Sequence, residues 1–279
     1  MGDGWTWDET LYAGSAAHYV AGRMGYPREL GARIVEAVGG VGVARALDVG
    51  CGPGSLTLLL AGCVAEVVGI DADPGMLAQA RIAAERAGVT NVAWRRMRAE
   101  QLPADLGAVD LVTFAQSFHW MERERVAAAV RGMLRARGAL VHVHATTGWG
   151  DSSTDPLPRP RPPYDEIRAL VAAYLGPVPR AGRSLLATPR GGESAVYRAA
   201  RFDGPERVEV PRGEVVQRSV QEIVDATFSL SSSTPALFGD RRERFEAELR
   251  ALLEAAADDG RFCERVRDVA FDVWRPGSS

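Results

Sequence analysis

Short apolar runs alternate with segments of helical periodicity through the first half of the chain. Over residues 28–39, the apolar residues Leu30, Ile34, Val35 and Val38 fall on one face of a predicted helix. Further helices are predicted over residues 56–61, 74–87 and 122–135, and strands over residues 44–49, 64–70, 91–97, 108–115 and 139–145. Strands that alternate with helices in this way indicate βαβ units and a mostly parallel sheet.

The second half of the chain is less regular. Residues 148–163 are rich in Pro, Ser, Thr and Asp and predict a loop, and residues 176–192 form another irregular piece. Helices are predicted over residues 164–175, 221–228 and 241–256, and strand-like stretches over residues 208–216 and 262–274. Because the proline-rich loop is too short to link independent domains, residues 1–279 are expected to form one domain with an insertion.

Composition narrows the class of protein. The net charge is −3 and no basic stripe is interleaved with aromatics, so no nucleic-acid partner is expected. All 33 basic residues are arginine, a bias that fits a GC-rich genome and leaves no lysine for a Schiff base. The three cysteines lack zinc-ligand spacing, so no metal is expected. With neither a signal-peptide pattern nor a long apolar run, we expect a cytoplasmic protein that has no membrane partner.

The segment ALDVGCGPGSLTLLL, residues 46–60, contains the clearest candidate site. A strand ends at Asp48, then Gly50, Gly52 and Gly54 alternate with other residues, and a helix begins. Glycine permits sharp turns and close approach to a ligand, and helix N-termini attract negative charge. The glycine spacing differs from the dinucleotide fingerprint, and a phosphate loop would need a lysine. The loop therefore predicts a ligand without phosphate.

Asp71 ends the second predicted strand, 17 residues after Gly54. An acidic residue near this separation accepts hydrogen bonds from ribose hydroxyls. The alternative role for Asp71 is a helix cap, but Asp73 stands directly before Pro74 and fits that role better. Asp71 is therefore the candidate for ribose binding.

The segments LDVGCGPG (47–54) and GIDADPGML (69–77) resemble the first two motifs of class I S-adenosylmethionine-dependent methyltransferases. The later segments RAEQLP (98–103), VDLVTFAQSFHWM (109–121) and GMLRARGALVHV (132–143) resemble the following motifs of that family in the same order. The strings AQSFHW and FSLSSSTPALF are similar to a small-molecule branch of the family, of the methyltransferase type 11 kind.

The resemblance implies a Rossmann-like, doubly wound α/β fold. Its sheet would have seven mostly parallel strands with an antiparallel last strand, and lid insertions would be added to it. Residues 1–30 would form an N-terminal lid, 31–147 the cofactor-binding core, 148–200 an insertion and lid, and 201–279 the part that completes the sheet.

The resemblance also implies S-adenosyl-L-methionine as the cofactor. The implied contacts are Asp48, Gly50, Cys51, Gly52 and Gly54 at the methionine end, Asp71 at the ribose, Ala72, Met76, Ala99 and Glu100 at the adenine, Gln116 beside the methionine part, and Tyr19 and Arg23 closing over the cofactor. Arg98 stands where many relatives carry Asp, which removes the expected side-chain hydrogen bond to the adenine amine.

Three histidines are candidate catalytic residues. Alignment supplies much of the rate of methyl transfer, and a general base is needed only for a poorly acidic acceptor. His119 follows the fourth strand, where it is either a base or a packing residue. His144 shares a strand face with His142 and lies nearer the functional edge, and His18 belongs to the entry segment.

The sequence favours methyl transfer to a small-molecule acceptor. Trp5, Trp7, Trp149 and Tyr164 are expected to line an apolar pocket for that acceptor. A second reading is a protein that binds S-adenosylmethionine structurally and no longer transfers methyl. A nicotinamide oxidoreductase is disfavoured by the glycine spacing. The acceptor, the methylated atom and the oligomeric state stay open at this point.

Overall fold

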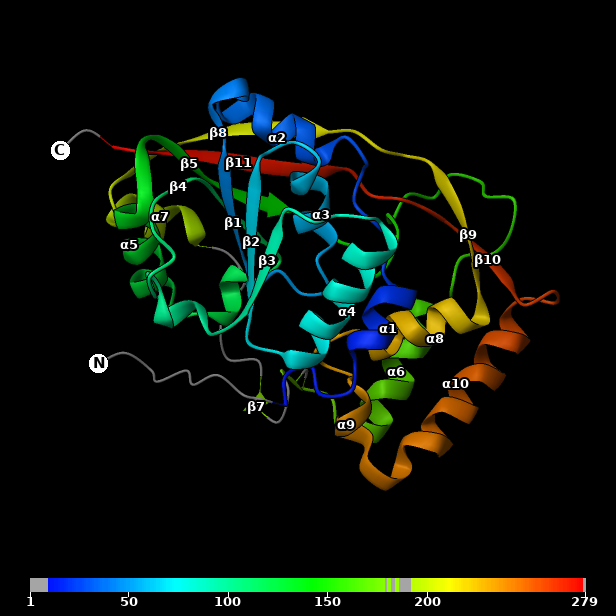
Figure 1. The fold of residues 1–279 in the computed structure, drawn as a ribbon. Coiled ribbons are helices and arrows are strands. Elements are labelled where there is room, and N and C mark those ends of the chain that lie inside the picture. The colour runs from blue at the N-terminus through cyan, green and yellow to red at the C-terminus, as the bar shows by residue number, and fades with distance from the viewer. Residues whose placement is uncertain (1–9, 179, 182–183, 186–191, 278–279) are drawn as a thin grey trace.

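A seven-stranded sheet forms the centre of the molecule in a computed structural model, which describes residues 10–178, 180–181, 184–185 and 192–277 (Figure 1). The strand order is β3-β2-β1-β4-β5-β11-β8. The strands are β1 (Arg45–Val49), β2 (Glu66–Asp71), β3 (Val92–Arg96), β4 (Val109–Ala115), β5 (Leu134–His144), β8 (Phe202–Val210) and β11 (Val269–Pro276). Strand β11 alone in this sheet runs opposite to the other six strands. The predicted Rossmann-like α/β fold with an antiparallel last strand is confirmed.

Helices cover both faces of the sheet. On one face, α2 (Leu30–Val38) and α3 (Ser55–Ala61) bury apolar residues against the strands. On the other, α5 (Arg123–Met133) and α7 (Glu193–Ala199) do the same. Helix α4 (Pro74–Arg86) follows β2 directly. Strand β1 is buried along most of its length because it lies between β2 and β4 and is covered on both faces.

A second group of helices lies beside the sheet (Figure 1). It consists of α1 (Ala16–Gly22), α6 (Tyr164–Leu175), α8 (Val220–Phe228), α9 (Pro235–Phe238) and α10 (Arg242–Ala256), with the antiparallel pair β9 (Val215–Ser219) and β10 (Arg261–Arg265). Helices α6, α8, α9 and α10 enclose an apolar core of their own. Helix α1 packs closely on α8, because a Cβ on Gly22 would lie 2.1 Å from the Ala226 nitrogen.

Shorter elements complete the described chain. They are the 3₁₀ helices η1 (Gly40–Gly42), η2 (Ala99–Gln101), η3 (Phe118–Trp120) and η4 (Gly239–Arg241), and the strands β6 (Arg180–Ala181) and β7 (Ser184–Leu185). Among the residues that the structure describes, no helix combines the length and apolar character needed to cross a membrane. The division of the chain into core, insertion and lids remains a prediction, and residues 1–9 of the predicted N-terminal lid lie outside the described residues.

Two sequence-based strand assignments need correction. The stretch 208–216 contains the end of β8 and the start of β9, which belong to different sheets. The chain turns between them at residues 211–214, where Gly213 has φ +116°. Likewise, the stretch 262–274 is divided between β10 and β11. Both breaks leave a local signal in the sequence: Pro211 and Gly213 are turn residues inside the first stretch, and the apolar spacing changes between Val266 and Val269 in the second.

A buried ion pair ties the helical group to the loop after β5. Arg218 on β9 and Glu264 on β10 lie 3.1 Å apart, and both are almost completely buried. Arg218 also donates to the carbonyl oxygens of Gly22 (2.7 Å) and Glu222 (2.9 Å). Glu264 accepts from the Gly150 backbone N–H at 2.6 Å and from the Tyr164 hydroxyl at 2.8 Å. Each charge is thereby paired and hydrogen-bonded, as burial requires.

Removal of one partner of this pair is expected to destabilise the fold strongly. Glu264→Ala leaves the Arg218 guanidinium buried without its counter-ion, a change that costs about 3–5 kcal/mol of unfolding free energy. Urea unfolding followed by circular dichroism measures this loss. The matched control is Glu36→Ala, which breaks the exposed Arg33–Glu36 pair and should change stability little. Equal losses in the two variants would show that the buried pair does not hold these elements together.

Candidate functional site

A cavity lies where the carboxyl ends of β1, β2 and β4 meet, the position at which open α/β sheets bind ligands. Nine predicted cofactor contacts line it: Tyr19, Gly50, Gly52, Asp71, Ala72, Met76, Ala99, Glu100 and Gln116. The cavity thus brings together residues from the entry segment, the glycine loop and the ends of three strands.

The glycine loop passes close to the segment that follows β4. Gly50 has φ +69°, and a Cβ there would lie 2.5 Å from the Ser117 Cβ. The Ser117 hydroxyl donates to the Val49 carbonyl oxygen at 2.6 Å, which joins the ends of β1 and β4. Any side chain at residue 50 would therefore push these two loops apart. At Gly52 the Cβ direction points into open space, so its backbone is exposed to the cavity.

Asp71 links the glycine loop to the end of β2. One carboxylate oxygen accepts from the Gly52 N–H and the other from the Asp73 N–H, each at 2.8 Å. Burial raises the pKa of Asp71 to about 6. Asp73 caps α4 by accepting from the Met76 N–H at 2.9 Å. Of the two roles considered for Asp71, the cap therefore belongs to Asp73, and the Asp71 carboxylate keeps lone pairs on the cavity side.

Asp48 lies beneath the loop and does not line the cavity. Its two oxygens accept from the hydroxyls of Thr57 on α3 (2.6 Å) and Thr113 on β4 (2.7 Å). The carboxyl group is buried, and burial raises its pKa despite both hydrogen bonds. In this arrangement Asp48 fixes the ends of β1, α3 and β4 relative to one another.

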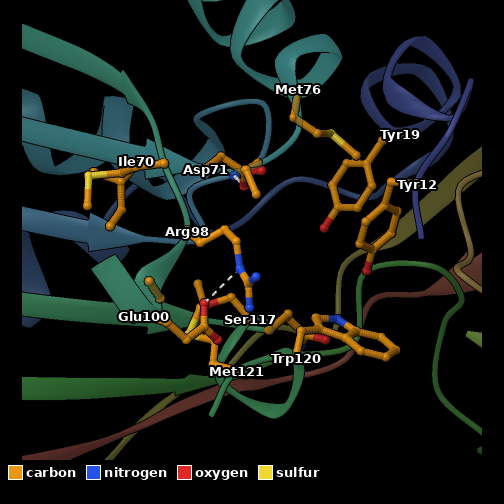
Figure 2. A pocket seen from close by; sticks show the side chains of 17 residues that line it. Tyr12, Tyr19, Ile70, Asp71, Met76, Arg98, Glu100, Ser117, Trp120 and Met121 are labelled. Carbon is orange, nitrogen blue, oxygen red and sulfur yellow. Dashed lines mark hydrogen bonds and ion pairs between the residues drawn. The ribbon is translucent and has the colours of Figure 1, made fainter. Parts of the chain in front are cut away.

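One wall of the cavity is aromatic. Tyr12, Tyr19 and Trp120 face the cavity from the side opposite Asp71 (Figure 2). Tyr12 packs edge-on against the other two rings, with both centroids 6.4 Å away. Burial raises the pKa of Tyr12 to about 12, so its hydroxyl stays protonated and can donate a hydrogen bond near neutral pH.

Arg98 extends into the middle of the cavity (Figure 2). Its Nε donates to the buried carboxylate of Glu100 at 3.3 Å. The same carboxylate accepts from the Glu122 N–H at 3.0 Å, which ties η2 to the start of α5. The residue that departs from the family pattern therefore offers donors where an acidic side chain would offer acceptors.

Four predicted cofactor contacts do not line the cavity: Arg23, Asp48, Cys51 and Gly54. Cys51 is buried behind the loop. At Gly54, with φ +83°, a Cβ would lie 2.8 Å from the Trp94 ring, so this glycine leaves room for the Trp94 side chain of β3. Arg23 donates to the Ser229 hydroxyl at 2.8 Å and lies 4.7 Å from the centroid of the Tyr19 ring. Arg23 therefore packs against Tyr19, which lines the cavity, but does not line the cavity itself.

Sequence reasoning left other lining residues unassigned: Tyr12, Ile70, Met97, Arg98, Ala115, Ser117, Trp120 and Met121. Several directly adjoin residues that were assigned, so the ends of the strands gave a usable signal. Tyr12 had none, because it precedes the entry segment and belongs to no periodic element.

A second, more open cavity adjoins the first. Gln116 lines both cavities and has φ +61°, an uncommon conformation for a residue with a side chain. His119, His142 and His144 line the second cavity. His18 lines neither of these two cavities, since its Nδ1 lies 2.6 Å from the Asp225 carboxylate and joins α1 to α8. The catalytic roles of the histidines remain predictions.

Charged groups of both signs surround the second cavity. The arginines are Arg207, Arg212, Arg265 and Arg267, and the acidic residues are Asp151, Glu193, Glu209 and Asp268. Among the described residues, no cluster of three or more His, Cys, Asp or Glu side chains has the arrangement of a metal site.

A mostly apolar third cavity lies between α6 and α8 and includes Trp149 and Tyr164. Trp5 and Trp7, predicted to line an acceptor pocket with them, lie outside the described residues.

Comparisons with known proteins agree with this geometry. Residues 46–138 match a protein family described as a methyltransferase domain. The chain is 34% identical over 134 residues to an uncharacterized methyltransferase of Mycobacterium tuberculosis, a match that covers 48% of this chain and 51% of that protein. It is 38% identical over 81 residues to a ubiquinone biosynthesis O-methyltransferase of Acinetobacter baumannii, which covers 29% and 34% respectively. The chain therefore spans about half the length of the first curated relatives that it matches.

Solved structures share the fold. A protein of Bacillus halodurans, provisionally named a methyltransferase, has a TM-score of 0.51 at 16% identity, and the match covers 90% of this chain and 100% of that one. The [4+2]-cyclase SpnF has a TM-score of 0.52 at 19% identity, with 99% and 100% covered. Residues 46–138 thus match a methyltransferase domain, and the seven-stranded sheet has the fold of these solved structures, as the motifs predicted. Because one protein of this fold is a cyclase, the fold alone does not determine the reaction.

The position of Gly50 gives a test of the loop. Gly50→Ala combines a left-handed conformation, which costs about 1–2 kcal/mol for an alanine, with a collision against Ser117. We expect it to lower the affinity for S-adenosylhomocysteine at least tenfold in calorimetry. Gly88→Ala is the matched control, since Gly88 has φ +65° at the end of α4 and nothing near its Cβ direction. It should lose similar stability and keep its affinity, whereas equal affinities in both variants would contradict the role of the loop.

Proposed function

We propose that this chain transfers the methyl group of S-adenosyl-L-methionine to a small-molecule acceptor. The observation that carries the proposal is the junction of two cavities at Gln116. The first contains the glycine loop and Asp71 at the strand ends, and the second is open and lined by histidines. In this arrangement the cofactor occupies the first cavity, with its methyl group directed toward the second.

The residues of the first cavity fit this cofactor. The exposed backbone of Gly50 and Gly52 suits the methionine end, and the Asp71 carboxylate suits two ribose hydroxyls. Ile70, Met76 and Met97 offer apolar surface to the adenine ring. When bound, the cofactor supplies an electrophilic methyl group on a sulfonium. The protein holds it, excludes water with the Tyr12, Tyr19 and Trp120 wall, and aligns the acceptor.

The second cavity supports a small-molecule acceptor better than a nucleic acid. Its four arginines are matched by four acidic side chains, so it lacks the excess positive charge that tracks a phosphate backbone. The whole chain has a net charge of −3. A compact acceptor with several polar groups suits a cavity lined by charges of both signs.

The cofactor assignment predicts a pH-dependent affinity. Binding requires the ionised Asp71 carboxylate, because the protonated group accepts ribose hydrogen bonds poorly. Since the pKa of Asp71 is about 6, affinity for S-adenosylhomocysteine should be full above that pH and fall below it. Calorimetry at pH 7.5 and pH 5, one value above the pKa of Asp71 and one below it, measures the change.

Asp71→Asn is the control for this titration, because its amide has a similar shape and no carboxyl proton. Its affinity at pH 7.5 should be lower by about 1.5–3 kcal/mol, the loss for hydrogen bonds to a charged group. Any pH dependence of affinity that remains in Asp71→Asn comes from the ligand and from other ionisable groups of the protein. A wild-type protein whose affinity follows the same pH profile as Asp71→Asn would remove Asp71 from the ribose site.

Formation of S-adenosylhomocysteine during turnover separates methyl transfer from a purely structural use of the cofactor. Protein that binds the cofactor should release this product only when an acceptor is present. If a substrate is consumed while the bound cofactor is recovered unchanged, that result would favour another reaction on the same fold.

A further inference from the structure

A row of hydrogen-bonded ionisable side chains borders the second cavity, and cofactor binding does not use it. His144 and Arg207 line the cavity, and Asp272 lies between them. His144 Nε2 lies 2.8 Å from one oxygen of Asp272, and the other oxygen accepts from Arg207 at 3.1 Å. These residues come from β5, β11 and β8, which are adjacent in the sheet. Residue pairing places Asp272 opposite both His142 and Arg207, so the whole row lies on one face of the sheet.

This row determines which nitrogen of His144 carries a proton. Asp272 is mostly buried, and its charge is paired with Arg207. An ionised carboxylate only accepts hydrogen bonds, so the proton between it and the ring belongs to His144 Nε2. Nδ1 then keeps its lone pair, and in the part of the chain that the structure describes it has no hydrogen-bond partner. The His144 side chain is 37% exposed and lines the second cavity.

A second histidine supports the ring of His144. His142 stacks on it with centroids 4.7 Å apart and planes at 24°. Its Nδ1 lies 2.8 Å from the Tyr197 hydroxyl oxygen, and burial lowers its pKa to about 4. His142 is therefore neutral near pH 7 and adds no charge that would oppose protonation of His144. The other charged and titratable residues that line this cavity are His119, Asp151, Glu193, Glu209, Arg212, Arg265, Arg267 and Asp268.

We infer that His144, oriented by Asp272, is the general base that takes a proton from a hydroxyl group of the acceptor. This inference rests on the proposed function and names its substrate class. An acceptor oxygen attacks the methyl carbon, the new O–C bond forms, and the C–S bond breaks with its electron pair going to sulfur. The proton of the hydroxyl passes to His144 Nδ1. The products are a methyl ether, S-adenosylhomocysteine and an imidazolium held against Asp272.

The pairing of Asp272 with Arg207 favours a hydroxyl over an alkylamine as the group beside the base. An alkylamine arrives as a cation near neutral pH, whereas a hydroxyl is neutral. Arg207 matches the charge of Asp272, so the pair presents no net negative charge to attract a cation. Arg267 also lines the cavity, and its Nε donates to the Gly150 carbonyl oxygen at 2.7 Å, not to a carboxylate.

The first test needs no acceptor. Long-range nitrogen–proton spectra of the imidazole rings, recorded on the full chain with S-adenosylhomocysteine, should show His144 as the Nε2–H tautomer that protonates at Nδ1. In Asp272→Asn this tautomer preference should weaken, because the amide can also donate to the ring. A wild-type His144 with its proton on Nδ1 would offer no lone pair to the cavity and would overturn the inference.

The second test compares matched acceptors. Phenol, catechol and phenylethanol are paired with aniline, ortho-phenylenediamine and phenylethylamine, and S-adenosylhomocysteine formation is measured with each. Product is expected with hydroxyl probes, and His144→Gln should slow it about 100-fold or more, the usual effect of a general base. Asp272→Asn, a positioning variant, should lower kcat and change its pH profile while KM for the cofactor stays the same.

The outcomes separate the base from the proposed function. Calorimetry should show unchanged affinity for S-adenosylhomocysteine in His144→Gln, because His144 does not line the cofactor cavity. Methylation confined to the amine probes, or hydroxyl methylation that His144→Gln leaves at the wild-type rate, would overturn the base and leave methyl transfer standing. A wild-type protein that does not bind S-adenosylhomocysteine would contradict the proposed function itself.

Discussion

The buried carboxylate of Asp48 is the constraint on which the cofactor cavity depends. A carboxylate in the centre of a sheet is costly unless hydroxyls or amides replace its water, and Thr57 and Thr113 do so here. These two bonds hold α3 and β4 at fixed positions relative to the end of β1. The loop between β1 and α3 then has one path, with Gly50 against Ser117 and the Gly52 N–H on Asp71. Asp48 shapes the cavity from below without reaching it.

A second constraint places the acceptor side. Strand β11 inserts antiparallel between β5 and β8, and its register brings Asp272 beside the histidines of β5 and Arg207 of β8. The buried Arg218–Glu264 pair holds the loop after β5 through the Gly150 N–H. The two cavities are therefore built by different parts of the chain and meet where β4 ends, at Gln116.

The sequence predicted most of the core because local patterns determine it. Alternating strands and helices, the glycine loop and the Asp71–Asp73 spacing are all short-range features, and the structure has each of them. The roles of Asp272 and Arg207 were not predictable, since they lie 128 and 63 residues from His144 in the chain and meet it only through strand pairing. Tyr12 was missed for lack of periodicity. The boundaries of β8–β9 and β10–β11 were missed although Pro211, Gly213 and the changed apolar spacing after Val266 mark them.

A crystal structure of the protein with S-adenosylhomocysteine bound tests the central claim most directly. The account predicts that the ribose hydroxyls contact Asp71, that the adenine lies beside Met76, and that the sulfur faces the junction at Gln116 and the cavity that contains His144. Product bound in another cavity, or a sulfur directed away from that junction, would contradict the assignment of the two cavities to cofactor and acceptor.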